Sequence, residues 1–95
     1  RIPLHAHAAW PDLLALLAAL ESRPRAAAKL LGWGDAGWAR SGRERGPVTL
    51  TAIQRAESIA SGTLGDETFV HLRREGALLR SEDVDAIAFA AEDVS

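Results

Sequence analysis

The sequence predicts an all-α fold of four to five short helices packed in antiparallel pairs. Alanine and leucine dominate the chain, whereas valine and isoleucine, which favour strands, are sparse. Apolar residues recur at helical spacing in several segments, and these segments are bounded by prolines, glycines and charged residues of the kind that begin or end helices. Both observations favour helix over sheet along most of the chain.

Length and composition indicate one small globular domain. The chain has 95 residues, 47% of them hydrophobic, with a net charge of −2 and no cysteine. So weak a charge gives no general attraction to nucleic acid or anionic membranes, and the absence of cysteine removes disulfides and thiolate metal sites. No apolar run reaches the roughly 20 residues of a membrane-spanning helix. Because the chain begins at Arg1, without a methionine or a signal-peptide pattern, we expect residues 1–95 to be a single helical domain cut from a longer protein.

Two helices are predicted on either side of a short turn at Pro24. The first, over residues 12–22, has leucines at helical spacing and Pro11 at its start. The second runs from Arg25 through the leucines that follow and extends toward Arg40. Helices joined by so short a turn pack antiparallel. The leucines that define the apolar face of the first helix are Leu13, Leu14, Leu16, Leu17 and Leu20.

A polar loop is predicted over residues 40–47, and a third helix follows it. The loop combines glycines, charged residues and a proline. Thr51 and Gln54 have the spacing of a capping box, in which a hydroxyl and an amide side chain each satisfy a free backbone N–H of the other. We therefore expect the third helix to begin at Thr51, with Ile53 and Ala56 on its apolar face.

The stretch LGDETFVHLRREG has the pattern of a short helix with its boundary signals. Asp66 is expected to be the N-cap and Gly76 a left-handed stop, while the acids near the start and the arginines near the end suit the helix dipole. Phe69 and Leu72 are expected to point inward, and His71 to lie on the exposed face. A final helix is expected from Ser81, with Val84, Ile87 and Ala88 or Ala91 on its apolar side.

Two blocks of the sequence resemble the C-terminal tail of large bacterial signal-transduction ATPases, which include LuxR-type and winged-helix transcriptional regulators and some class III adenylyl cyclases. The blocks are RAAAKLLGWGDAGW and LGDETFVHLRREGALLRSEDVDAIAFA, with a polar loop and a capped helix between them. The likeness spans residues 13–90 and implies tetratricopeptide-like helix pairs that relay signals and bind partners. Arg73 stands where the family has tryptophan. The matching positions are Leu30, Leu31 and Gly32, then Leu64, Gly65, Glu67, Phe69, Glu75 and Gly76.

No constellation for catalysis, metal binding or cofactor binding is evident in the sequence. His5 and His7 would project to opposite sides of an extended chain, with no third ligand close by. His71 has Glu67 and Glu75 at helical spacing but no serine or cysteine beside it that would make a nucleophile. Phosphate-binding and dinucleotide-binding glycine motifs are also missing. We therefore expect a non-enzyme with no cofactor and no metal.

Three features are candidates for contact with a partner. The glycines between Trp33 and Trp38 allow close approach, and tryptophan is enriched at interface hot spots, although core packing is the alternative for both rings. The arginines of the loop could contact phosphate, with a solvated loop as the alternative. The leucine surface of the first helix is wider than one neighbouring helix can cover. The residues predicted to bind a partner are Trp33, Trp38, Arg40, Arg43, Leu13 and Leu17.

With the resemblance, these patterns predict a non-catalytic interaction or signal-relay module of a bacterial transcriptional regulator or signalling ATPase. We expect it to be cytoplasmic, to bind a protein partner or a neighbouring domain of the parent chain, and to pair with a second copy when isolated. The alternative is a small helical DNA-contacting domain of a transcriptional regulator. A recognition helix carries its basic residues where it enters the groove, whereas Arg73 and Arg74 stand at the C-terminal end of their helix.

Overall fold

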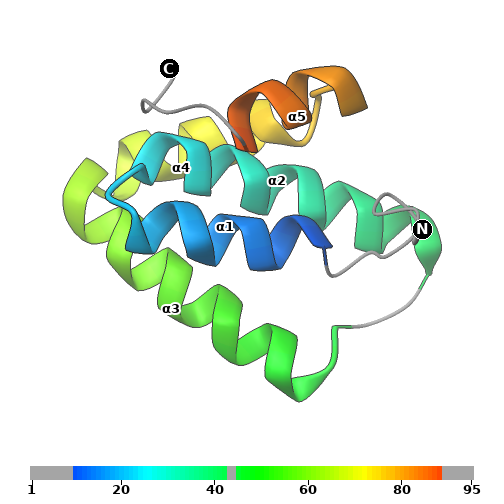
Figure 1. Cartoon of the computed structure of the whole chain (residues 1–95), viewed down its shortest axis with the longest axis horizontal. Helices are drawn as coiled ribbons and strands as arrows, with labels where there is room; N and C mark the ends of the chain where they lie inside the picture. Colours follow the sequence, from blue (N-terminus) through cyan, green and yellow to red (C-terminus); the bar gives the residue numbers. More distant parts are fainter. Residues whose placement is uncertain (1–9, 43–44, 89–95) are drawn as a thin grey trace.

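The computed structural model describes residues 10–42 and 45–88, and this part of the chain is all-α, as the sequence predicts (Figure 1). Five helices and no strand occur in these described ranges. The helices are α1 (Trp10–Leu20), α2 (Pro24–Ser41), α3 (Pro47–Leu64), α4 (Asp66–Gly76) and α5 (Ser81–Ala88).

The central helix of the bundle is α2. It lies antiparallel beside α1, as the short turn between them predicts, and it also packs against α3, α4 and α5 (Figure 1). Every residue from Ala26 to Gly32 is buried. Because seven consecutive residues span almost two turns of helix, burial of all of them means that neighbours cover α2 on every side.

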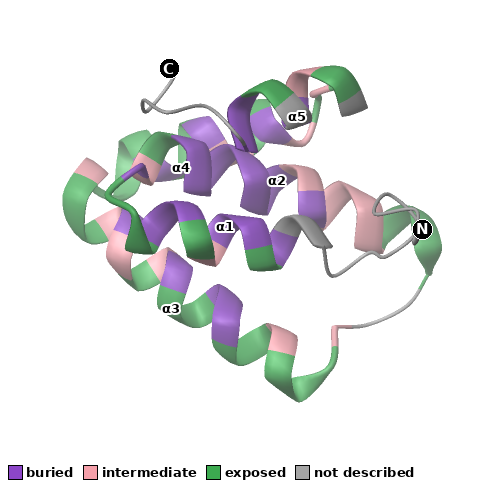
Figure 2. Ribbon diagram, in the orientation of Figure 1, coloured by how far each residue is buried: buried purple, intermediate pink, exposed green. Residues whose placement is uncertain are grey.

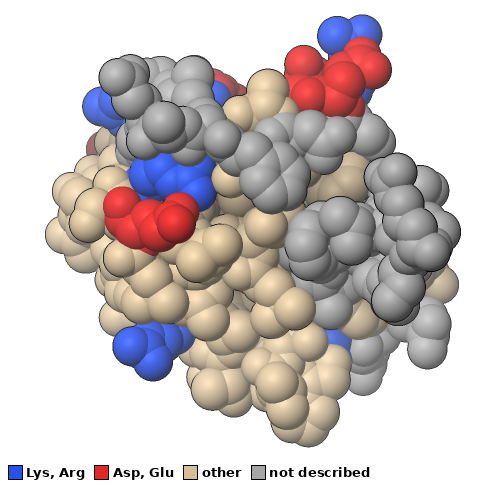
Figure 3. Space-filling model, viewed as in Figure 1, with Lys and Arg blue, Asp and Glu red and all other residues tan. Residues whose placement is uncertain are grey.

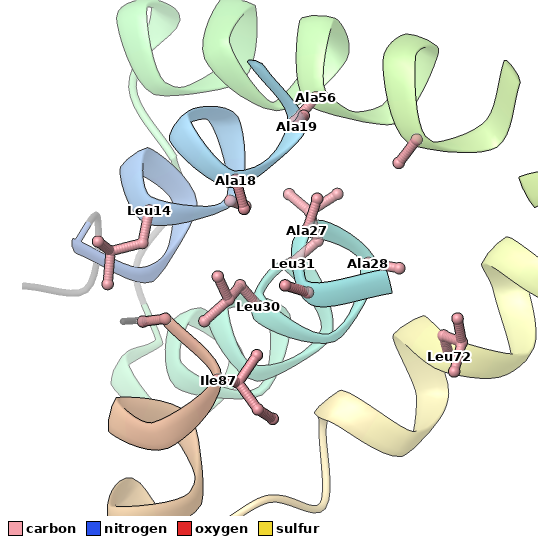
Figure 4. Packing of buried hydrophobic residues seen from close by; sticks show 14 of the residues in the cluster. Leu14, Ala18, Ala19, Ala27, Ala28, Leu30, Leu31, Ala56, Leu72 and Ile87 are labelled. Atoms are coloured by element: carbon pink, nitrogen blue, oxygen red, sulfur yellow. The ribbon is translucent and has the colours of Figure 1, made fainter. Parts of the chain in front are cut away.

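The core is built mainly from alanine and leucine. Small alanine side chains on α1, α2 and α3 let the backbones of these helices approach closely, because the separation of packed helices depends on the side chains at their contact. Leu30 and Leu31 fill the space at the centre and are fully buried (Figure 4). The fully buried alanines are Ala15, Ala18, Ala26, Ala27, Ala28, Ala56 and Ala60.

Two glycines allow α2 and α4 to touch backbone to backbone. A Cβ placed on Gly32 would lie 1.7 Å from the Arg73 carbonyl oxygen, and one placed on Gly76 would lie 2.0 Å from the Lys29 carbonyl oxygen. Both distances are far below van der Waals contact, so only glycine fits at either position. Gly76 is therefore required by packing. Its φ is not positive, so the predicted left-handed stop there is wrong.

The start of α3 differs from the prediction because a proline begins the helix earlier. Pro47 occupies the first helical turn, where the missing N–H of proline costs nothing, and Gly46 precedes it as the N-cap. Thr51 consequently lies inside α3, and its hydroxyl donates a hydrogen bond to the Pro47 carbonyl at 3.0 Å. The predicted capping box is wrong for this reason. The predicted loop is correspondingly shorter, since Arg40 belongs to α2.

The last two helices carry the predicted inward faces. Phe69 and Leu72 of α4 are 7% and 8% exposed, and α5 begins at Ser81 as predicted. Asp66 is the first helical residue rather than the cap, because Gly65 takes the N-cap position with a φ of 87°. Buried residues on α5 are Val84, Ile87 and Ala88.

Candidate functional site

The outer surface of α1 is made of leucine. Leu13, Leu17 and Leu20 are 48%, 49% and 53% exposed. Leu16 is partly buried, and the remaining residues from 12 to 20 are buried. Each position in this span that reaches the surface is therefore a leucine, and we call these four residues the leucine face. Exposed positions lie along the outer side of α1 in Figure 2, and Figure 3 shows an uncharged surface between the acidic and basic groups at its left and the grey residues at its right.

The inner surface of α1 is built from smaller side chains. Ala15, Ala18 and Ala19 face the core with Leu14, and α1 packs against both α2 and α3 (Figure 4). A flat alanine surface lets α1 sit close to two neighbours at once. Of the leucines of α1, Leu14 thus lies in the core, whereas those of the leucine face lie at the surface.

The buried polar residue of α1 is Asp12, which is fully buried and lies at the edge of the leucine face, one helical turn before Leu16. Its carboxylate accepts hydrogen bonds from Trp38 Nε1 at 2.7 Å and from Arg45 Nε and Nη2 at 3.0 and 3.1 Å. Gly34 makes room for this carboxylate, because a Cβ there would lie 2.3 Å from Asp12 Oδ1. These bonds fix the rotation of α1 about its own axis, and that rotation points the leucine face outward.

Further ion pairs connect Asp12 to the rest of the bundle. Arg45 Nη2 lies 2.8 Å from Asp35 Oδ1, and Arg73 donates two hydrogen bonds to Asp35 at 2.7 and 2.9 Å. Arg73 also pairs with Glu57 of α3. We call Asp12, Trp38, Arg45, Asp35, Arg73 and Glu57 the polar network; it joins α1, α2, α3 and α4.

The polar network shifts the ionisation of its members. Burial on its own raises the pKa of Asp35, but hydrogen bonds and positive charge from Arg73 and Arg45 outweigh burial and hold this pKa below its ordinary value. The hydrogen bond to Asp35 raises the pKa of Arg73. Burial lowers the pKa of Arg45, and Asp12 and Asp35 more than reverse that effect. All three groups are therefore held in their charged forms.

Both tryptophans predicted to contact a partner are partly buried, and each uses its indole N–H within the chain. Trp33 Nε1 donates to the Leu79 carbonyl at 3.1 Å, which fixes the segment between α4 and α5. Trp38 binds Asp12, and the Arg45 guanidinium lies 6.0 Å from its ring centre. These contacts give both rings a structural role, and a partner role for them remains a prediction.

The other predicted partner residues are Arg40, Arg43, Leu13 and Leu17. Arg40 is exposed near the end of α2, and the two leucines belong to the leucine face. Arg43, His5 and His7 lie outside the described residues. The structure thus brings only the two leucines together on one surface.

The buried ion pair between Asp12 and Arg45 was not predicted from the sequence. The signal available for it was a single acidic residue beside the apolar run of the first helix.

The outer side of α4 borders a hollow of about 630 Å³. His71 lies on this side, exposed as predicted, and its Nε2 is 2.7 Å from Glu75 Oε2 one turn away. In the described part of the chain, no three acidic or histidine side chains gather in a way that would hold a metal ion. The described residues that line the hollow are Asp66, Glu67, Thr68, Val70, His71 and Arg74.

Comparison with family models, with curated proteins and with solved structures gave no match for this chain. Of the helices described here, none is long and apolar enough to cross a membrane.

Proposed function

We propose that this chain is a non-catalytic helical interaction module that binds an apolar surface of a protein partner through the leucine face of α1. The observation that carries the proposal is that leucine occupies each surface-reaching position between residues 12 and 20. A surface helix of a globular protein carries polar residues on its solvent side. In α1 the acidic residue Asp12 is buried and the leucine face is exposed. This pattern is typical of a helix whose outer surface is covered by another protein or domain.

The energetic argument supports the same proposal. Complete burial of a leucine side chain contributes about 1.5–3 kcal/mol, so covering three half-exposed leucines contributes about 2–4 kcal/mol. Contiguous exposed apolar residues of this kind mark contact sites on soluble proteins. The polar network holds α1 in one orientation, so the leucine face is preformed and little conformational entropy is lost on binding.

The biological setting of the proposal rests on the sequence resemblance. On this basis we propose that the module belongs to the tetratricopeptide-like tail of a bacterial transcriptional regulator or signalling ATPase, where the partner is another protein or a neighbouring domain of the same parent chain. In this setting the module relays a signal by contact.

The test is binding of an apolar probe to the leucine face. We expect wild-type protein to bind a synthetic amphipathic helical peptide with leucines at positions i, i+3, i+4 and i+7, and we expect Leu13→Ser and Leu17→Ser to weaken this binding. The matched control is Leu78→Ser, because Leu78 is 86% exposed between α4 and α5, away from the leucine face. Fluorescence anisotropy of the labelled peptide measures the affinity. Equal binding by wild-type and both α1 variants would contradict the proposal.

A further inference from the structure

We propose that the leucine face also binds a second copy of this chain, with the two α1 helices antiparallel about a two-fold axis near Leu17. This inference rests on the proposed function and names a partner for the same surface. Two features of α1 support it, the spacing of the leucines and the absence of charge from the leucine face, and the size of the surface sets the strength of the pair.

The leucine spacing is nearly the same when α1 is read in either direction. With a rise of about 1.5 Å per residue, Leu17 is about 6 Å from Leu13 and about 4.5 Å from Leu20 along the helix axis. A two-fold axis near Leu17 therefore places Leu17 against its copy and Leu13 against Leu20 of the second copy. A surface that pairs with itself in this way meets the requirement of a two-fold dimer.

The lack of charge on the leucine face also suits pairing with a second copy. A two-fold contact brings each charged residue near its own copy or near a residue of the same helix, so a charge within the face would create repulsion. The leucine face has none, and the Asp12 carboxylate is turned inward and paired with Arg45. Glu21, just beyond the C-terminal end of α1, is paired with Arg23 at 2.6 Å, so these two residues bring no net charge to the edge of the face.

The size of the surface sets the strength of the dimer. A stable complex of standard size buries about 800 Å² per partner, which is more than three half-exposed leucines supply. We therefore expect a reversible dimer with a Kd between about 10 µM and about 1 mM. A dimer this weak leaves the leucine face available to a stronger partner.

The first experiment is sedimentation equilibrium of the whole chain from about 5 µM to about 1 mM, the range in which such a Kd is measurable. We expect wild-type protein to pass from monomer to dimer. Leu17→Glu places two carboxylates together at the axis and should weaken association more than about tenfold, because like charges across an interface are strongly unfavourable. Leu78→Glu is the matched control and should dimerise like wild type. Circular dichroism checks that each variant keeps its helical fold.

The second experiment tests the orientation by mixing two variants. In the antiparallel pair, Leu13→Lys of one chain faces Leu20→Glu of the other, so the mixture should associate more tightly than either variant alone. The control mixture, Leu13→Lys with Leu13→Glu, brings no opposite charges together and should show no such gain. Tighter association of the control mixture would instead indicate parallel helices and overturn the proposal.

A monomeric wild type at the highest concentration, or a dimer that Leu17→Glu leaves intact, would also overturn it. Neither result would contradict the proposed function. Peptide binding by the leucine face is measured separately, at concentrations where the chain is monomeric.

Discussion

The backbone crossing of α2 and α4 provides a sharp test of the structure. Replacing Gly32 with alanine puts a Cβ 1.7 Å from the Arg73 carbonyl oxygen. A normal carbon–oxygen contact is about 3.3 Å or longer, so the two helices must separate by about 1.6 Å. The opposing atom is backbone, which cannot rotate away as a flexible side chain would.

We expect Gly32→Ala to destabilise the fold by about 2–3 kcal/mol. Overpacking of a well-packed core costs about 1–3 kcal/mol and occasionally more, and a clash with backbone this close should cost about 3–4 kcal/mol; the better helix propensity of alanine recovers about 1 kcal/mol. The total stability of a 95-residue domain is about 5–14 kcal/mol, so the loss is a large fraction of it. The melting temperature should fall by about 10–20 °C.

Gly37→Ala is the matched control on the same helix. A Cβ at Gly37 meets no atom within 4 Å, and its φ is not positive. Alanine there should stabilise the protein by about 0.4–1 kcal/mol, through helix propensity and a less flexible unfolded chain. Urea unfolding followed by circular dichroism measures both variants. If the two variants had the same stability, the close crossing of α2 and α4 would be refuted.

Three further predictions concern the polar network and α4. Asp12→Ala leaves Arg45 and the Trp38 N–H without their buried partner and should cost about 3 kcal/mol in urea unfolding; a loss below about 0.5 kcal/mol would show that Asp12 does not anchor α1. Phe69→Ala should cost about 3–5 kcal/mol and His71→Ala less than about 0.5 kcal/mol, and the reverse ranking would mean that α4 presents its other face to the core. The pKa of Asp35 is lower in the folded state than its ordinary 3.8, so its contribution to stability is present above that pH and lost as the pH falls through the folded value. Wild type and Asp35→Asn should therefore converge in stability in acid, and a stability difference that does not change with pH would contradict this.

The sequence determined the helical class and most helix positions because these depend on local physics. Leucines at helical spacing, prolines at the starts and a charged, glycine-rich segment are all short-range signals. The inward direction of Phe69 and Leu72 also follows from the pattern of their own helix. Local signals mislead where two of them compete, as when Pro47 begins α3 one turn before Thr51.

Tertiary structure decided which side of α1 is buried. Leucine is the more apolar side chain, so composition alone favours burying Leu13, Leu17 and Leu20. The close approach of α2 and α3 instead suits the alanine side, because small side chains allow shorter distances between helices. Asp12 reinforces that choice through bonds to Trp38 and Arg45, which lie 26 and 33 residues away in the chain.

Packing between distant segments likewise decided the role of Gly76. Beside arginines and at the end of a helix, a glycine has the local pattern of a left-handed stop. Its actual role depends on the carbonyl of Lys29, a residue of another helix, and no pattern within α4 contains that information. The exposure of the leucine face is also decided by packing between distant segments. The sequence shows that these leucines are present, but they lie on the surface because α1 packs against α2 and α3 through its other side.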